Sequence, residues 1–459
     1  MRQYCEAMSC TIALFTRDLR VHDNPMLGTA CSADLPVHAM FVLDKQLLER
    51  DSIGPNRRAF LGECLADLDA SLRARGSRLH VQSGSWVDEV MRTVTASDAT
   101  ELHLSADVSR FAQHRREALS EQLRAKGVAL VLHDSVTAVA PGVIVPAGSN
   151  EYKVFTPYYR RWCATPRRAV LDAPASIRTT DSASTRTDPA GLHVTPADLA
   201  PHRLIGGETK ARELVESWFD TGIATYAELH NDLAGDATSH LAPYLHFGCI
   251  SALELVLRSE SHPKGAEFAR QLCWRDFFHQ ILAARPEVDR VDFRSRGDVW
   301  NEDPEAFRRW ADGTTGYPLV DAAMRQLLRE GFMHNRARMV VASFLTKDLY
   351  LDWRLGAAHF LRHLSDADVA NNQLNWQWVA GTGSDTNPNR IFNPVLQSKR
   401  FDPSGAYIRR YVPELGSLTG EAIHWPGPLD REFAGYPPPM VDHGEAIAAY
   451  RLAVSSRAR

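Results

Sequence analysis

One stretch of the chain combines an amide, an indole and a guanidinium at helical spacing. Gln271, Trp274, Arg275 and Phe278 stand at positions i, i+3, i+4 and i+7, so a helix places them on one face. Such a face suits a pocket that stacks against a planar ring and hydrogen-bonds its edge. A surface helix with a partly buried tryptophan has the same pattern, so this segment alone leaves both interpretations open.

A second segment, His334 to Met339, pairs an amide with a thioether. Asn335 and Met339 are four residues apart, with Arg336 beside them. The amide and the soft sulfur could line a cavity for a base, while the arginine could reach a phosphate. A charged helix with one methionine in the core is the alternative that this segment leaves open.

Two carboxylates and two histidine rings raise the question of a metal. Asp366 and Asp368 could bind Mg²⁺, but amides and indoles surround them and no lysine-bearing phosphate loop is present. His359 and His363 have the spacing of zinc ligands, without a glutamate after the first or an evident third ligand. We therefore expect no metal. Trp376 and Trp378 follow, and two residues apart they cannot share a helix face.

Thr238 and Ser239 stand just ahead of the apolar residues Leu241 and Ala242, with His240 between them. Hydroxyl residues ahead of an apolar run mark a helix N-terminus. The free N–H groups of such an end can bind a pyrophosphate. Simple capping by the hydroxyl groups is the other interpretation.

The elements that position these residues fall into two kinds. Short β-type runs at 11–15, 37–43, 79–82, 101–104 and 128–132 alternate with amphipathic stretches such as 57–75 and 110–126. This alternation predicts an α/β domain over 1–138, with a parallel doubly wound sheet covered on both faces. Because no GxGxxG fingerprint follows a strand, we assign no dinucleotide to this domain.

The remaining chain is divided by composition and periodicity. Residues 139–204 are rich in Pro, Ala, Ser and Thr and predict an interdomain linker, of which the aromatic part at 152–162 should dock. From 205 to 459 the helical period dominates and strand signals vanish. This part holds every tryptophan except Trp86 and Trp162, and it predicts an all-helical, aromatic-rich domain.

Composition excludes several classes of protein. No apolar run approaches the roughly 20 residues of a membrane span, and the N-terminus lacks the pattern of a signal peptide. Seven scattered cysteines without a CxxC pair fit reduced thiols, so we expect a cytoplasmic protein. The net charge is −4, so any nucleic-acid site must be a local basic surface.

Together these segments resemble the photolyase/cryptochrome family, in particular class I cyclobutane-dimer photolyases. The resemblance covers nearly the whole chain and is carried by these motifs: FTRDLRVHDN at 15–24, the segment 238–251, WRDF at 274–277, TGYPLVDAAMR at 315–325 and RIFNP at 390–394. It implies light-dependent repair of cyclobutane pyrimidine dimers in DNA by a monomeric lyase. It also implies a start a few residues before the first strand, so either Met1 or Met8 is the initiator.

The resemblance implies an FAD bound in the helical domain. By motif position the phosphates and ribityl chain would be held by Tyr226, Thr238, Ser239, His240, Leu241 and Ala242. Arg275 and Asp366 correspond to a salt-bridged pair beside the isoalloxazine, with Ala367 and Asp368 nearby. Asn372 falls where the family places a residue that faces flavin N5, and an asparagine there adds no negative charge.

The family also implies an electron path and a lesion pocket. Trp376, Trp353 and Trp300 match three tryptophans that lead from the flavin to the surface. The DNA-binding residues carried over are Gln271, Trp274, Arg275, Phe278, Asn335, Arg336, Met339 and Trp378. Asp44, Arg57 and Asp107 lie where relatives bind an antenna, either 8-hydroxy-5-deazaflavin or 5,10-methenyltetrahydrofolate.

One departure from the class I pattern keeps alternatives open. Class I enzymes usually carry a glutamate where this chain has Gln271, and glutamine there is typical of (6-4) photolyases and animal cryptochromes. The (6-4) reaction needs a histidine pair, but these positions are Asn335 and Met339, which cannot donate a proton. A (6-4) photolyase and a cryptochrome-type blue-light receptor remain the alternatives.

Overall fold

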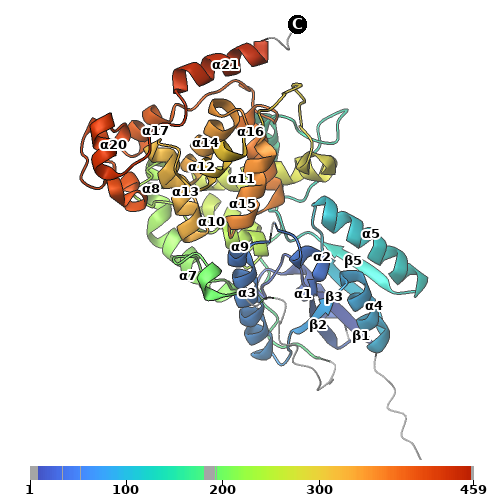
Figure 1. Ribbon diagram of the computed structural model, residues 1–459. Coiled ribbons are helices and arrows are strands. Elements are labelled where there is room, and N and C mark those ends of the chain that lie inside the picture. The colour runs from blue at the N-terminus through green and yellow to red at the C-terminus, as the bar shows by residue number, and fades with distance from the viewer. Residues whose placement is uncertain (1–8, 34, 52, 180–191, 193, 456–459) are drawn as a thin grey trace, which may run out of the picture. The chain divides into compact units, whose positions relative to one another are not determined.

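The structure is a computed structural model that describes residues 9–33, 35–51, 53–179, 192 and 194–455. By contacts the chain forms two compact units. The first unit comprises Met1–Asp198, Ile205–Ile223 and Ser239–Pro286, and the second comprises Leu199–Leu204, Ala224–Thr238 and Glu287–Arg459. Figure 1 gives the labels of the elements.

A five-stranded sheet lies in the first unit. Its strands are β1 (Cys10–Leu14), β2 (Val37–Asp44), β3 (His80–Gly84), β4 (Ala99–Ser105) and β5 (Ala129–His133). The order is β3-β2-β1-β4-β5 and every pairing is parallel. The predicted doubly wound α/β fold is confirmed, and each expected strand overlaps one of these five.

Helices cover both faces of this sheet. They are α1 (Pro25–Ser32), α2 (Lys45–Leu48), α3 (Pro55–Arg73), α4 (Trp86–Ala96) and α5 (Arg110–Ala125). Ile12 and Leu14 of β1 belong to one core cluster with Trp86 and Val90 of α4 and Leu119 of α5. Alternate side chains of a strand point to opposite faces, so the remaining side chains of β1 point to the other face of the sheet. Helix α1 contacts β1, β4 and β5.

The first unit also contains helices from the middle of the chain. They are α6 (Phe155–Ala164), α7 (Glu208–Ser217), α9 (Ala242–Phe247), α10 (Ala252–Ser261) and α11 (Ala266–Ala284), with a π-helical turn η3 (Trp218–Gly222). As predicted, the aromatic segment docks: the Phe155 ring stacks on Trp274 of α11, with centroids 3.7 Å apart. The Trp162 indole donates to Asp276 at 2.9 Å.

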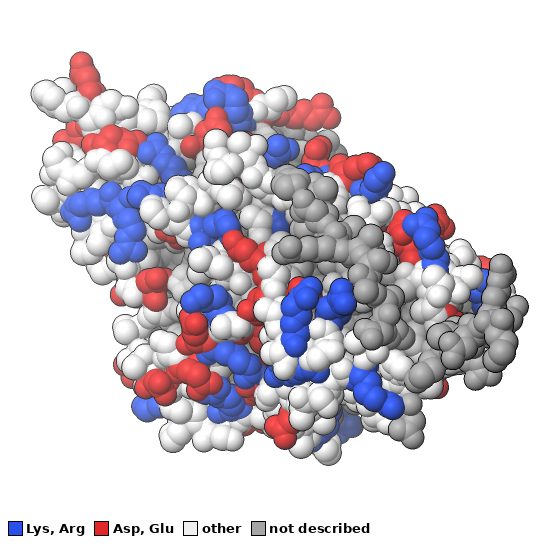
Figure 2. Space-filling model, turned by 90° about the horizontal axis from the view of Figure 1, so that it is seen from below, with Lys and Arg blue, Asp and Glu red and all other residues white. Residues whose placement is uncertain are grey.

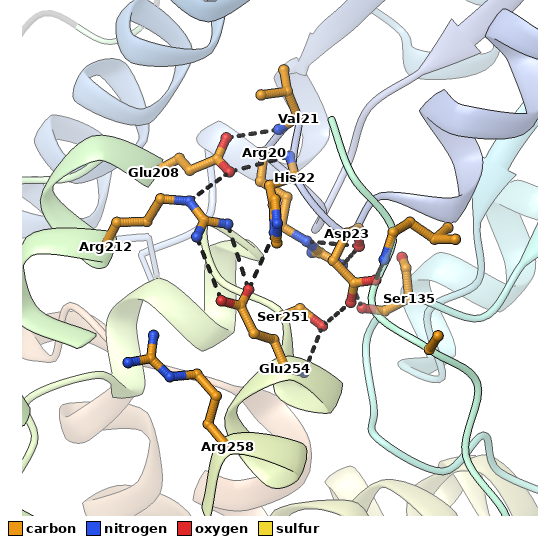
Figure 3. Close-up of polar contacts among 12 residues, drawn as sticks. Arg20, Val21, His22, Asp23, Ser135, Glu208, Arg212, Ser251, Glu254 and Arg258 are labelled. Atoms are coloured by element: carbon orange, nitrogen blue, oxygen red, sulfur yellow. Dashed lines mark hydrogen bonds and ion pairs between the residues drawn. The ribbon is translucent and has the colours of Figure 1, made fainter. Parts of the chain in front are cut away.

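A buried polar cluster joins the start of the chain to these helices (Figure 3). The guanidinium of Arg20, 1% exposed, donates to the carbonyl oxygens of Asp23, Ser135 and Gly248. Gly248 ends α9 with φ of 69°, and a Cβ there would lie 2.0 Å from the Arg17 carbonyl oxygen, so only glycine fits.

Figure 3 also shows Arg212 of α7 between two carboxylates. It contacts Glu208 at 3.3 Å and Glu254 at 3.4 Å, while Glu208 accepts from the backbone of Val21 at 2.7 Å. Asp23 accepts from the Ser251 hydroxyl at the start of α10. These contacts hold the loop after β1 against α7 and α10.

The described part of the second unit is built from helices. They are α8 (Ile223–Leu229, which begins in the first unit), η4 (Pro286–Asp289, likewise), α12 (Pro304–Ala311), α13 (Pro318–Glu330), α14 (Asn335–Ser343), η5 (Phe344–Asp348), α15 (Trp353–His363), α16 (Val369–Ala380), α17 (Pro394–Phe401), α18 (Ala406–Tyr411), η6 (Pro413–Leu415), α19 (Glu421–His424), α20 (Pro428–Ala434) and α21 (His443–Ser455). One core cluster includes Trp310, Trp353 and Trp376. The aromatic-rich helical fold predicted from the sequence is thus confirmed.

Surface charge and hydropathy add two observations. Figure 2 shows Lys and Arg interspersed with Asp and Glu on the face it draws, without a continuous stripe of one sign among the coloured residues. Within the described residues, none of the helices combines the length and the apolar character that crossing a bilayer requires.

Candidate functional site

The predicted face of α11 carries a half-buried indole between polar and apolar neighbours. The Trp274 ring stacks on the Phe155 ring. The ring of Phe278, a residue that is 2% exposed, has its centroid 5.6 Å from that of Trp274. Gln271, one turn earlier, is half-buried and donates to Glu267 at 3.2 Å. The helix therefore places Gln271 and Trp274 at the edge of the core and Phe278 inside it.

Arg275 has partners at both ends of its guanidinium. It donates to the carbonyl oxygens of Val136 at 2.6 Å and of Leu245 at 3.3 Å. The neighbouring Asp276 accepts from the backbone of Val139 at 3.0 Å, and burial raises the pKa of its carboxyl group. Arg275 thus ties the segment after β5 to α9, and its predicted contact with a cofactor stays a prediction.

Arg336 of α14 lies in the second unit. Its guanidinium contacts a side-chain amide and an aromatic ring. Its Nε and Nη2 atoms donate to Asn231 Oδ1 at 3.0 and 2.7 Å. The guanidinium also lies over the Phe401 ring, 4.4 Å from its centroid. Burial, followed by the charge of Arg400, lowers the pKa of Arg336. Asn335 is exposed at the first position of α14, and Met339 packs against the core cluster.

A chain of hydrogen bonds connects this arginine to Tyr226. The Asn231 amide nitrogen lies 2.9 Å from His230 Nε2, and His230 Nδ1 lies 2.8 Å from the Tyr226 carbonyl oxygen. Because a carbonyl only accepts, Nδ1 carries the hydrogen and Nε2 accepts from the amide.

Asp366 forms a two-pronged ion pair that the sequence analysis did not foresee. Its carboxylate, in a residue 7% exposed, accepts from Arg338 at 2.7 and 3.3 Å. Arg338 also donates to the Met333 carbonyl at 2.8 Å, which fixes its position. Ala367, the next residue, is buried.

The start of α16 is organised by carboxylate and amide groups. Asp368 caps the helix, accepting from the backbone and side-chain nitrogens of Asn371, each at 2.9 Å. Asn372 donates its amide hydrogens to the Ala357 carbonyl at 3.0 Å and to Gln373 at 2.8 Å. These two bonds fix the orientation of the amide, and its oxygen accepts no hydrogen bond from the described part of the chain.

The three predicted electron-path tryptophans lie in or against one core cluster. Trp376 of α16 is 3% exposed and packs on Phe360, and Trp353 is fully buried with its indole nitrogen 2.9 Å from Asp292 Oδ1. Trp300 is half-buried at the edge of the cluster. Trp378 also packs against this cluster, half-buried, although it cannot share a helix face with Trp376, and the Arg390 guanidinium lies 5.1 Å from its ring centroid.

The segment before α9 corrects the capping interpretation. The helix begins at Ala242, and its N-cap residue is Leu241, which makes no side-chain cap. Ser239 accepts only weakly from the Leu241 backbone, at 3.4 Å, and His240 has a left-handed φ of 52°. The Thr238 hydroxyl is shielded from solvent and has no hydrogen-bond partner among the described residues. Capping does not occupy these hydroxyl groups because the loop turns away before the helix starts.

Two of the predicted antenna residues, Asp44 and Asp107, lie at or just after the carboxyl ends of β2 and β4 in the first unit. Asp107 pairs with Arg17 at 3.1 Å, and Asp44 lies 3.7 Å from Arg115. A hollow of about 220 Å³ is lined in part by Asp107, Gln113, Arg116, Asp134 and His279. Asp44 and Arg57 do not line it, and Arg57 is buried in α3.

The candidate metal ligands do not form a larger set. The rings of His359 and His363 lie 4.5 Å apart. Among the residues that the structure describes, His, Cys, Asp and Glu side chains form no group of three or more that could hold a metal ion.

Comparison with known proteins gives one consistent result. Residues 11–176 match the family model described as DNA photolyase, and residues 268–456 match the FAD binding domain of DNA photolyase. The deoxyribodipyrimidine photo-lyase of Streptomyces griseus is 51% identical, over 97% of this chain and 99% of the relative. That of Synechococcus sp. is 33% identical, over 93% and 92%.

Solved structures extend the similarity to the fold. A bacterial class III photolyase from Agrobacterium tumefaciens has a TM-score of 0.92 at 32% identity, with 98% of each chain covered. The Synechocystis sp. PCC6803 cryptochrome has a TM-score of 0.89 at 28% identity, covering 97% of this chain and 99% of that one. With two matching family models and a relative that is identical at half of its positions, the chain belongs to the DNA photolyase family.

Proposed function

We propose that this chain is a light-driven DNA repair enzyme of the class I type, which uses bound FAD to split cyclobutane pyrimidine dimers. The observation that carries the proposal is the arrangement of α16. Its first turns present Asp368 and Asn372 beside the Arg338–Asp366 pair, and its buried Trp376 leads into the tryptophan cluster. Polar groups for a flavin and an oxidisable path thus lie on one helix.

The residues of the chain fit an FAD. The Thr238 hydroxyl is shielded from solvent without a partner in the described residues, and the Asn372 amide oxygen is an unused acceptor there. A buried polar group without a partner is costly, so the Thr238 hydroxyl favours a ligand that supplies one, and the half-buried Asn372 oxygen is available to accept a hydrogen bond from the same ligand. We propose that Tyr226, Thr238, Ser239, His240, Leu241, Ala242, Arg275, Asp366, Ala367, Asp368 and Asn372 hold FAD.

Bound reduced FAD supplies the light-driven electron that opens the cyclobutane ring and afterwards returns to the cofactor. The residues of the chain bind and position the DNA. Enzymes that act on bases must take them out of the duplex stack. The indole of Trp274 and the thioether of Met339 offer apolar surface to the extruded bases, while the amides of Gln271 and Asn335 offer hydrogen bonds. Phe278, Arg275, Arg336 and Trp378 complete the proposed set.

The substrate follows from the residues at two positions. Neither Asn335 nor Met339 can donate a proton at neutral pH, and this favours the cyclobutane dimer over the (6-4) lesion, whose repair needs an acid. Gln271 supplies an amide where relatives carry a carboxylate, so hydrogen bonding to the lesion is kept without its negative charge. Similarity to the Synechocystis cryptochrome keeps a light receptor as the second candidate.

We further propose that Trp376, Trp353 and Trp300 pass electrons inward when the cofactor is oxidised. Each indole is readily oxidised. Successive short electron transfers along the three indoles can be faster than the return of the electron from the cofactor. The packing of all three in or against one cluster supports this path.

We also propose a separate role for each of three segments of the chain. Residues 1–138 would bind an antenna, 139–204 would form the linker, and 205–459 would bind FAD and DNA. The hollow at Asp107 is a candidate site for the antenna, which is 8-hydroxy-5-deazaflavin or methenyltetrahydrofolate. A photolyase of Sulfolobus tokodaii, 29% identical, was crystallised with two FAD molecules, so a second FAD is a further candidate. We expect a cytoplasmic monomer.

One experiment tests the function. The purified protein is reduced, illuminated with oligonucleotides that carry either a cyclobutane dimer or a (6-4) lesion, and the products are separated. We expect a flavin absorption spectrum and restoration of the cyclobutane substrate alone, with a dark sample as the control. Repair of the (6-4) lesion, or flavin binding without any repair, would contradict the proposal and favour the corresponding alternative.

A further inference from the structure

A buried lysine lies beneath an exposed loop of the second unit. Lys347 belongs to the π-helical turn η5 and is 1% exposed. Its ammonium group donates to the carbonyl oxygen of Pro388 at 3.4 Å and to that of Arg390. The loop, residues 381–393, connects α16 to α17, and the residues of its tip, 386–390, are exposed or half-buried. One buried ammonium group thus contacts the backbone of the tip at two places.

The loop places Arg390 beside one of the proposed DNA-binding residues. The guanidinium of Arg390 lies 5.1 Å from the centroid of the Trp378 ring, and the side chain is 43% exposed, so a DNA phosphate can reach it. Asp385 accepts from Arg390 Nε at 3.4 Å and from the Asn387 backbone at 3.0 Å. Asp385 therefore orients the side chain of Arg390, while Lys347 holds its backbone.

The surroundings of Lys347 disfavour its charge. Among the residues that the structure describes, no carboxylate oxygen forms an ion pair with its ammonium group, and a buried charge without such a partner is costly. Burial, with smaller effects of Arg296 and Arg390, lowers the pKa of Lys347 to about 7, while Asp385 and Asp348 oppose this shift. The side chain therefore changes its charge near neutral pH, directly beneath the loop tip.

The elements around η5 supply further polar groups. From α21, the Tyr450 ring has its centroid 5.7 Å from Lys347 Nζ, and His443 is hydrogen-bonded to Asp348. Arg296 Nη1 lies 3.4 Å from the Pro388 carbonyl oxygen, which Lys347 also contacts. A guanidinium stays charged at neutral pH, whereas Lys347 can lose its proton and with it the charge that strengthens its two hydrogen bonds.

We infer that Lys347 is a positioning residue, which holds Arg390 over Trp378 for contact with the damaged DNA strand. The inference rests on the proposed function, because that function makes Trp378 a DNA-binding residue. When Lys347 is charged, the loop tip is fixed before DNA arrives. When Lys347 is neutral, its bonds to the tip are weaker, and ordering the tip on binding reduces the affinity. The light-driven step inside the bound complex does not use Lys347.

The test is fluorescence anisotropy, in the dark, of the FAD-loaded protein with a dye-labelled duplex that contains one cyclobutane dimer. Lys347→Met keeps the length of the side chain without its donors or charge, and we expect about tenfold weaker binding at about pH 6. The ratio of the two affinities should shrink towards one at about pH 8.5, where Lys347 is neutral in the unmodified protein. Both proteins contain His443, so its contribution cancels in the ratio. Lys210→Met, which removes an exposed lysine paired with Glu213, is the matched control and should leave the affinity unchanged.

A double-mutant cycle tests whether Lys347 acts through Arg390. In an Arg390→Ala background, Lys347→Met should have little further effect, because the side chain that it positions is gone. The flavin spectrum and melting temperature of each variant establish that it has folded. If Lys347→Met does not fold, Arg390→Ala alone still decides, since the affinity of the unmodified protein should fall more steeply with rising pH than that of this variant.

Repair under light at saturating DNA separates positioning from chemistry. We expect the chemically reduced Lys347→Met protein to repair the bound dimer at the rate of the unmodified protein. Unchanged affinity in Lys347→Met, a loss of affinity that is equal at both pH values, or full additivity with Arg390→Ala overturns the inference, and so does a slower rate at saturation. These outcomes in a protein that repairs dimers defeat only the role of Lys347. Failure of the unmodified protein to bind FAD or dimer-containing DNA defeats the proposed function first.

Discussion

Arg338 holds Asp366 by two hydrogen bonds, at 2.7 and 3.3 Å, immediately before the helix that carries Asn372 and Trp376. The aspartate is 7% exposed, so its side chain is largely shielded from water. The pair fixes the segment between α15 and α16 and thereby the entry into α16.

Replacement of Arg338 by alanine should destabilise the protein by about 1–3 kcal/mol, because it leaves a buried carboxylate without its main donor. Urea unfolding measures the change. Asp366→Asn alone and the double variant complete a mutant cycle, and a coupling energy near zero would show that the two side chains act independently.

Gly356 of α15 leaves room for the Trp376 ring. A Cβ at this position would lie 2.2 Å from Trp376 Cη2 and 2.6 Å from Leu345 Cδ2. We expect Gly356→Ala to cost about 1–3 kcal/mol through overpacking, despite the better helix propensity of alanine. Gly62 in α3 is the control, because its nearest neighbour to a new Cβ is 3.8 Å away. There alanine should stabilise by about 0.5–1 kcal/mol. Equal effects at the two sites, measured by thermal unfolding, would refute the packing argument.

Replacement of Trp353 by phenylalanine should stop the light-driven reduction of bound FAD. Phenylalanine fills most of the space but is much harder to oxidise, so the path would break at its middle member. Absorption spectroscopy during illumination with a thiol present measures the rate. Trp425, 41% exposed, does not belong to the path, and Trp425→Phe should leave the rate unchanged. An unchanged rate in Trp353→Phe would exclude this path.

His359 should make the protein less stable in mild acid. Burial, then His363 and Arg362, lower the pKa of His359 from 6.5 to about 3, and its Nε2 has no hydrogen bond within the described residues. Between these values the unfolded chain binds a proton that the folded chain does not. The free energy of unfolding therefore falls as the pH drops below about 6.5, with a limiting slope of about 1.4 kcal/mol per pH unit. Urea unfolding of His359→Leu between pH 4 and 7 should show a shallower dependence, and parallel curves would contradict the assignment.

The parallel sheet could be predicted because its strands are short, apolar and bounded by turn residues. The docking of residues 152–162 could also be predicted, since so many rings cannot remain in water. Its partner could not, because the contact of Phe155 with Trp274 joins positions far apart in sequence. Local periodicity contains no information about such pairs.

The contacts of the candidate site could likewise be predicted from the sequence only in part. The spacing of Gln271, Trp274, Arg275 and Phe278 correctly predicts a shared helix face, but not that Arg275 donates to Val136 and Leu245. Arg338 was missed because an arginine in a charged helix has no sequence pattern that distinguishes a buried partner from a solvated one. Tertiary burial, which decides this, was visible only in the structure.

The cluster around Arg20 has a consequence for synthesis on the ribosome. The carbonyl of Gly248 and the hydroxyl of Ser251, which complete the bonds of Arg20 and Asp23, are made more than two hundred residues after them. Strands β1 to β5 can pair early during synthesis. The bonds from Arg20 to the Gly248 carbonyl and from the Ser251 hydroxyl to Asp23 can form only after residues 248–251 have been made. A fragment cut at residue 176, where the first family match ends, would keep the sheet and the Arg168–Asp23 ion pair, but it would remove the Gly248 carbonyl from the buried Arg20 and the Ser251 hydroxyl from Asp23. Fragments that aim to isolate the sheet should therefore extend through Pro286.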